Sequence, residues 1–86
     1  MPKLSEFFGI AIYMYWGDHG PPHFHARYAG EKASIAIEDL SILAGTLSPR
    51  ALGLVIEWAA LHRDELEFAW RKASNNEPVD PIEPLK

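Results

Sequence analysis

Hydrophobic and polar positions divide the chain into a first half with strand-like patterns and a second half with a helical pattern. An unbroken apolar run, FFGIAIYMYW, covers residues 7–16 and predicts a central strand that is buried on both faces. The stretches 22–29 and 32–38 favour two further strands. A short apolar stretch at 41–46 is compatible with a fourth strand. Glycine, proline and aspartate between these stretches are typical of turns.

From Ser48 onward the apolar positions repeat with the period of a helix. Ser48 is a candidate N-cap and Pro49 suits the first helical position, so the pattern predicts one long helix over residues 49–72. A stripe expected to face the sheet consists of Leu52, Val55, Ile56, Ala59, Leu66 and Trp70. A second stripe consists of Leu54, Trp58, Leu61 and Phe68. Because one sheet face needs only one stripe, the second must be covered by the tail, a second copy of the chain or a different protein.

The segment 74–86 is rich in proline and cannot continue the helix. The expected fold is therefore one α+β domain spanning residues 1–86. In it, an antiparallel β-meander of three or four strands packs against one long C-terminal α-helix, and an extended proline-rich tail follows.

Composition limits which cellular compartments and which classes of partner can be expected. The 86 residues include no cysteine, which excludes disulfides and thiol nucleophiles and favours a reducing, cytoplasmic compartment. No apolar run approaches the roughly 20 residues needed to span a bilayer, so no membrane contact is expected. The net charge of −4 argues against a general binder of nucleic-acid backbones, although a local contact with RNA stays open.

The segment DHGPPHFHARY, residues 18–28, holds three of the four histidines. Strand alternation places His23 and His25 on the same side, roughly 6.5 to 7 Å apart along the strand, with Arg27 beyond them. His19 lies in the preceding turn, which Asp18 is expected to cap.

Three interpretations of these histidines stay open. In the first, His19, His23 and His25 are ligands of a metal such as zinc; otherwise no cofactor is expected. In the second, His23, His25 and His62 are the acid–base groups of a metal-independent ribonuclease, and Arg27 holds the anion. In the third, the histidines are ordinary polar residues hydrogen-bonded to the turn.

Most of the chain resembles a family of small bacterial proteins described as domain of unknown function 4160. The segments that carry the resemblance are FFGIAIYMYWGDHGPPHFHARY, RALGLVIEWAALHRDEL and the terminal PIEPL. The resemblance implies a single-domain cytoplasmic protein that acts with a small partner encoded nearby, in an arrangement like a toxin–antitoxin pair. It brings no established activity. The residues that match the signature are Asp18, His19, Pro21, Pro22, His23, Phe24, His25, Trp58, His62, Arg63 and Leu66.

The leading hypothesis is thus a protein that acts through a protein partner, with the histidine-bearing strand face as its functional surface. A histidine-dependent ribonuclease is the alternative and a metal-binding module is the second alternative, so whether the protein is an enzyme stays open. A homodimer also remains an open arrangement. The candidate binding residues are Asp18, His19, Arg27, Arg63, Trp58 and Phe68.

Overall fold

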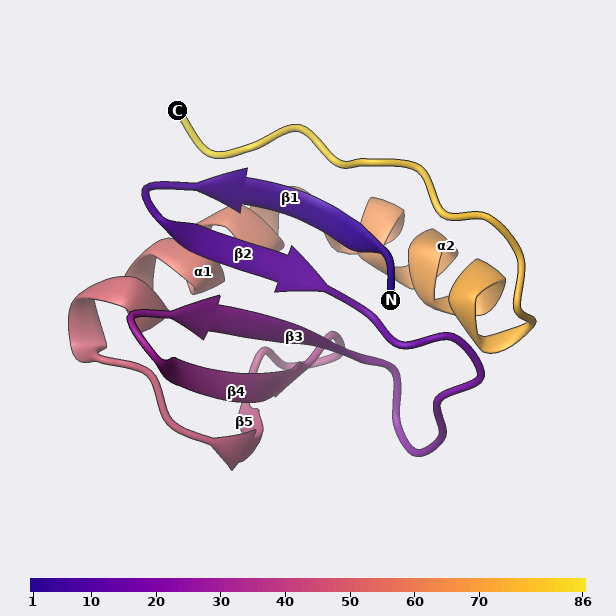
Figure 1. The fold of residues 1–86 in the computed structure, drawn as a ribbon, viewed down its shortest axis with the longest axis horizontal. Coiled ribbons are helices and arrows are strands. Elements are labelled where there is room, and N and C mark those ends of the chain that lie inside the picture. Colours follow the sequence, from indigo (N-terminus) through magenta and orange to yellow (C-terminus); the bar gives the residue numbers. More distant parts are fainter.

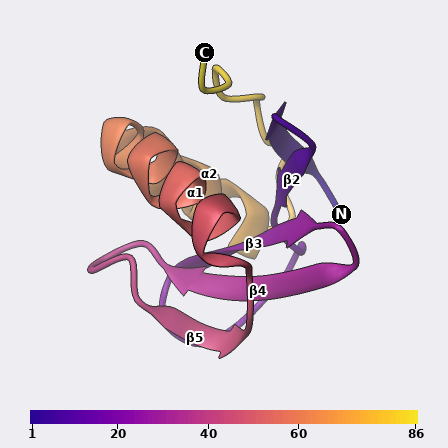
Figure 2. The same cartoon turned by 90° about the vertical axis from the view of Figure 1, so that its left-hand side faces the viewer.

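The chain forms one antiparallel sheet with two helices against one of its faces (Figures 1 and 2). The computed structural model describes residues 1–86. The strands are β1 (Lys3–Phe7), β2 (Ile10–Tyr13), β3 (His23–Tyr28), β4 (Glu31–Ala36) and β5 (Ile42–Gly45), and the helices are α1 (Pro49–Leu61) and α2 (Arg63–Ser74). Each strand pairs with the next, in the order β1-β2-β3-β4-β5. The predicted α+β meander is confirmed, but it has five strands rather than three or four.

The predicted single strand over residues 7–16 is wrong, because a tight turn divides this apolar run. Phe8 and Gly9 have φ angles of 51° and 82° and connect β1 to β2. Two successive positive φ angles belong to the two-residue turn whose twist matches a hairpin, and glycine adopts such angles without steric cost. Phe8 is apolar and exposed, so the hydrophobic pattern gave no sign of a turn.

The predicted single helix over residues 49–72 is also wrong, since the helix is interrupted at His62. This residue has φ −127° and ψ 29°, outside the helical range, and it lies between the end of α1 and the start of α2. Its Nδ1 lies 2.6 Å from Oε1 of Glu65 in the first turn of α2. Asp64 and Glu65 place negative charge at this new helix start, which suits the helix dipole.

The face that the helices turn toward the sheet combines four alanines with Val55, Leu66 and Trp58. Ala51, Ala59, Ala69 and Ala73 are buried along this face, which lets the helices lie close to the sheet. Trp58 is fully buried, with its ring 5.5 Å from Phe7 and 6.0 Å from Phe24. The separation of Trp58 from the sheet-facing stripe is therefore wrong, because Trp58 packs against Phe7 and Phe24 of the sheet. Leu61 and Phe68 of the second stripe are exposed.

The C-terminal tail runs beside β1 (Figure 1). The Ile82 amide donates a hydrogen bond of 2.7 Å to the Leu4 carbonyl, and Ile82 is buried. The Trp58 indole Nε1 donates a 2.8 Å hydrogen bond to the carbonyl of Glu83. The tail is thus the segment that covers Trp58.

Neither helix is long and apolar enough to cross a lipid bilayer.

Candidate functional site

The candidate site lies at the start of β3, where alternate side chains face opposite sides of the sheet. Phe24 and Ala26 are fully buried in the core under the helices. His23 and His25 point the other way, and their ring centroids lie 5.0 Å apart. The expected projection of both imidazoles to one side is observed.

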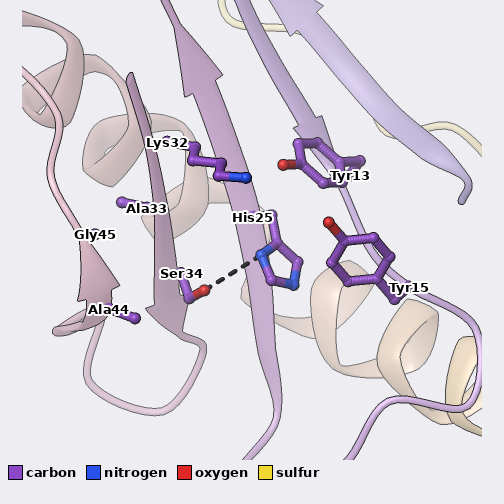
Figure 3. A pocket seen from close by; sticks show the side chains of 8 residues that line it. All are labelled: Tyr13, Tyr15, His25, Lys32, Ala33, Ser34, Ala44 and Gly45. Carbon is purple, nitrogen blue, oxygen red and sulfur yellow. Dashed lines mark hydrogen bonds between the residues drawn. The ribbon is translucent and has the colours of Figure 1, made fainter. Parts of the chain in front are cut away.

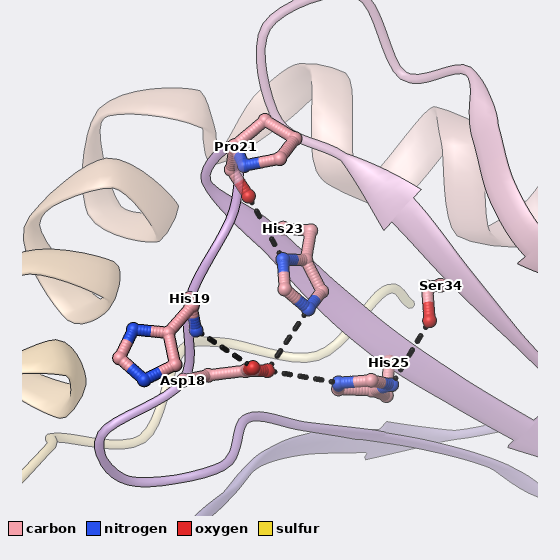
Figure 4. Close-up of polar contacts among 6 residues, drawn as sticks. All are labelled: Asp18, His19, Pro21, His23, His25 and Ser34. Carbon is pink, nitrogen blue, oxygen red and sulfur yellow. Dashed lines mark hydrogen bonds and ion pairs between the residues drawn. The ribbon is translucent and has the colours of Figure 1, made fainter.

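The loop before β3 is fastened at both ends, and this brings Asp18 against the imidazoles. The Gly17 amide donates a 2.9 Å hydrogen bond to the Ala73 carbonyl at the end of α2. The Pro22 carbonyl accepts a 3.0 Å hydrogen bond from the Ile37 amide. Between these two fixed points Asp18 folds back over β3 (Figure 4).

Asp18, His23 and His25 form a compact cluster, which we call the Asp18–His23–His25 cluster (Figure 4). Oδ2 of Asp18 lies 3.0 Å from Nε2 of His23 and 3.6 Å from Nε2 of His25. One ligand atom from each of the three residues lies within 4.8 Å of the others. The cluster therefore presents two imidazole nitrogens and one carboxylate oxygen to a common point.

The tautomer of His23 follows from its second ring nitrogen. Nδ1 of His23 lies 2.8 Å from the carbonyl oxygen of Pro21. A carbonyl oxygen can only accept a hydrogen bond, so Nδ1 carries the hydrogen and donates it. A bare lone pair on Nε2 would repel the Asp18 oxygen 3.0 Å away, so this contact needs either a second proton on Nε2 or a cation between the two atoms. The ring is held in place by Trp70 of α2, with centroids 4.9 Å apart.

His25 has one satisfied nitrogen and one unsatisfied nitrogen. Its Nδ1 lies 3.2 Å from the hydroxyl oxygen of Ser34 on β4. Its Nε2 is buried and has no hydrogen-bond partner, since the Asp18 carboxylate oxygen at 3.6 Å is too far away. Tyr13 stacks on the ring with centroids 5.3 Å apart. Buried polar atoms are rarely left without a partner, so Nε2 of His25 is available to bind a further group.

Burial and the neighbouring groups shift the pKa values of His25 and Asp18. Burial, followed by the neighbouring His23, lowers the pKa of His25, and Asp18 offsets only part of this effect. For Asp18, burial raises the pKa, but the His19 amide and the two imidazoles outweigh burial and hold the pKa of the carboxyl below its usual value. Near neutral pH the cluster thus combines a carboxylate with at least one neutral imidazole, the forms that bind metal ions.

The sequence model of a family described as Domain of unknown function (DUF4160) matches residues 9–71, which is more than half of the chain. The chain belongs to the DUF4160 family. No curated protein and no solved structure matches the chain.

The structure does not bring all the predicted site residues of the DUF4160 chain together. His19 donates its backbone amide to Asp18 Oδ1 at 2.8 Å, while its imidazole points away from the other two rings (Figure 4). Asp18, rather than His19, therefore completes the candidate ligand set. His62 contacts Glu65 and lies 5.5 Å from the Trp58 ring, and none of its polar contacts reaches the cluster.

The remaining predicted residues divide between the surface and the core. Arg27 lies on the outer face of the sheet, with its guanidinium 5.1 Å from the centre of the Tyr13 ring. Arg63 and Phe68 are exposed on α2, away from the cluster. Trp58 is fully buried, so it cannot form a surface for a partner in the folded protein.

Two residues at the site of this DUF4160 protein were missed by the sequence argument. Ser34 contacts His25 and Lys32 lines a pocket beside it (Figure 3). Strand alternation offered a means of finding them: Ala33 and Ile35 are buried, so their neighbours on β4 face outward with His25.

Proposed function

We propose that this DUF4160 protein binds a divalent transition metal ion through the Asp18–His23–His25 cluster, with Zn²⁺ as the first ion to test. The observation that carries the proposal is the buried Nε2 of His25, which lacks a hydrogen-bond partner beside a carboxylate and a second imidazole. Two imidazoles and one carboxylate are ligands that zinc and non-haem iron share. A metal ion at their common point satisfies all three ligand atoms at once.

The spacing of the ligand atoms supports the proposal. An ion with four ligands at about 2.0 to 2.1 Å in tetrahedral geometry holds neighbouring ligand atoms roughly 3.3 Å apart. The distances from Asp18 Oδ2 to the two Nε2 atoms, 3.0 and 3.6 Å, lie on either side of that value. All three ligand atoms lie within 4.8 Å of one another, so binding one ion requires side-chain rotations that draw the two imidazoles closer together.

The outer contacts of the two imidazoles also support metal binding. A histidine that binds a metal through Nε2 usually donates its Nδ1 hydrogen to a carbonyl or another acceptor, which fixes the ring. The Pro21 carbonyl serves this purpose for His23, and the Ser34 hydroxyl is placed to accept from His25. Both ligand nitrogens are thereby directed at the same point.

Three protein ligands leave at least one coordination position for water or for another molecule. Structural zinc sites are normally closed by four protein ligands, whereas catalytic sites keep an open position. A bound ion in this protein would therefore resemble the catalytic type, in which the metal lowers the pKa of a bound water.

Zinc titration of chelator-treated protein by isothermal calorimetry tests the proposal. We expect one ion per chain and a loss of affinity of at least about tenfold in His23→Ala, His25→Ala and Asp18→Asn, because each variant removes a ligand. His19→Ala is the matched control: it removes a neighbouring imidazole that points away, so its affinity should equal that of the parent. Unchanged affinity in His23→Ala and His25→Ala, or an equal loss in His19→Ala, would contradict the proposal.

The ribonuclease and partner-binding functions expected from the sequence stay predictions. A metal-independent ribonuclease would cleave RNA in the presence of chelator and lose that activity in His23→Ala, so the same variants separate it from the metal proposal. A small partner encoded nearby, a toxin–antitoxin-like role, a homodimer and a cytoplasmic location also remain predictions. Co-purification of the tagged chain from its host tests the partner.

A further inference from the structure

A pocket of about 210 Å³ lies on the outer face of the sheet beside the cluster (Figure 3). Its centre follows one row of paired residues across four strands, in which Tyr13 pairs with His25, His25 with Ser34, and Ser34 with Ala44. The row is hollow at one end because Ala44 and Gly45 carry almost no side chain there. Tyr15 and Lys32 close the sides.

The polar groups around this hollow are mostly hydrogen-bond donors. Figure 3 shows the Lys32 ammonium group and the hydroxyls of Tyr13, Tyr15 and Ser34 around the His25 imidazole. A tyrosine phenol carries its hydrogen at neutral pH, so the hydroxyls of Tyr13 and Tyr15 can both donate. Arg27 pairs with Lys32 in the next row, which adds a second cation beside the pocket.

The charge of the pocket is opposite to that of the whole protein. The chain has a net charge of −4, yet no carboxylate lines the pocket. The nearest acidic group of the site, Asp18, is directed at the two imidazoles instead. A ligand in the hollow therefore meets positive charge and hydroxyl donors, the environment that stabilises an oxyanion.

We propose that this pocket binds a small oxyanion of the phosphate class, either inorganic phosphate or the terminal phosphate group of a small molecule. The inference goes beyond the metal site and does not require it to be filled. The volume of about 210 Å³ is below the range of roughly 300 to 1,000 Å³ that is common for larger ligands. Two local cations on an acidic chain do not match the several phosphate contacts of an extended RNA strand.

Titration of the chelator-treated chain with inorganic phosphate, followed by amide NMR at constant ionic strength, tests the inference. We expect saturable shifts centred on Lys32, Ser34 and Ala44. Lys32→Ala should weaken binding at least about tenfold, because it removes a charged donor. Lys3→Ala, which removes the same charge from an exposed position on β1, should bind as the parent does.

A second variant tests the cavity rather than the charge. Ala44→Leu extends an exposed side chain into the hollow. We expect it to abolish the phosphate shifts while the rest of the amide spectrum stays that of the folded protein. Shifts that do not saturate, shifts centred away from the pocket, or an equal loss in Lys3→Ala would overturn the inference. So would a short single-stranded RNA that binds at Lys32 more tightly than phosphate does. Because Lys32 is not a metal ligand, Lys32→Ala should keep its zinc affinity, so the two proposals fail separately.

Discussion

At the scale of single residues, the site depends on how each imidazole is protonated. The Pro21 carbonyl fixes His23 with its hydrogen on Nδ1, whereas His25 faces a hydroxyl that can donate or accept. His25 therefore can change its hydrogen-bonding role without moving. Strand alternation was sufficient to predict that both rings share one side. It was not sufficient to choose Asp18 over His19, because that choice depends on how the loop is anchored to Ala73 and Ile37.

The low pKa of His25 gives a prediction for the metal-free protein. Burial opposes the charged imidazole, so its NMR titration midpoint should lie below the ordinary value of 6.5. The unfolded chain then binds this proton at higher pH than the folded chain, so folding stability should fall as pH drops below about 6.5 and level off below the folded pKa. Asp18→Asn should lower the midpoint further, since Asp18 raises it. A midpoint at or above that of a free histidine would show that the carboxylate outweighs burial.

At the scale of elements, the β1–β2 hairpin carries a residue poorly suited to its turn. Phe8 has a φ of 51°, and a left-handed conformation costs roughly 1 to 2 kcal/mol for most L-residues. Asparagine tolerates this conformation and is favoured before glycine in such turns. We expect Phe8→Asn to raise the free energy of unfolding by about 0.5 to 1 kcal/mol, measured by urea denaturation. Phe8→Ala is the control, because it keeps the strained backbone; equal stability of the two variants would contradict this account.

The hydrophobic pattern predicted some boundaries of helices and strands and missed others. β3, β4 and the start of α1 were predictable because alternation, Gly30 and the Ser48–Pro49 pair all point to the same boundaries. The turn at Phe8 was not, since an apolar residue occupies it. The interruption at His62 was not predictable either, because the helical period of buried residues continues through it. The backbone angles change locally at His62, and neither a glycine nor a proline marks this change in the sequence.

At the scale of the whole molecule, the tail connects the two layers of the fold. Its backbone contacts β1 through Ile82 and Leu4, and it contacts α1 through Glu83 and Trp58. One segment thus covers both an edge of the sheet and the largest side chain of the core. The sequence left open whether the tail, a second copy or another protein covers the second helix stripe, and only the folded chain shows that the tail contacts β1 and Trp58.

Removal of residues 78–86 should therefore destabilise the protein without removing the candidate site. Burying Ile82 contributes roughly 1.5 to 3 kcal/mol and the Trp58 hydrogen bond about 0.5 to 1.5 kcal/mol, so we expect a loss of about 3 kcal/mol in urea denaturation. Tryptophan fluorescence should shift to the red as Trp58 meets water. The cut after Glu77 keeps the carbonyl that accepts from Trp16, which limits the change to Trp58. Glu83→Ala is the control, because it keeps the backbone carbonyl that accepts from Trp58, and its stability should stay within about 0.5 kcal/mol of the parent. A truncated chain as stable as the parent would mean that the tail contacts contribute nothing to folding.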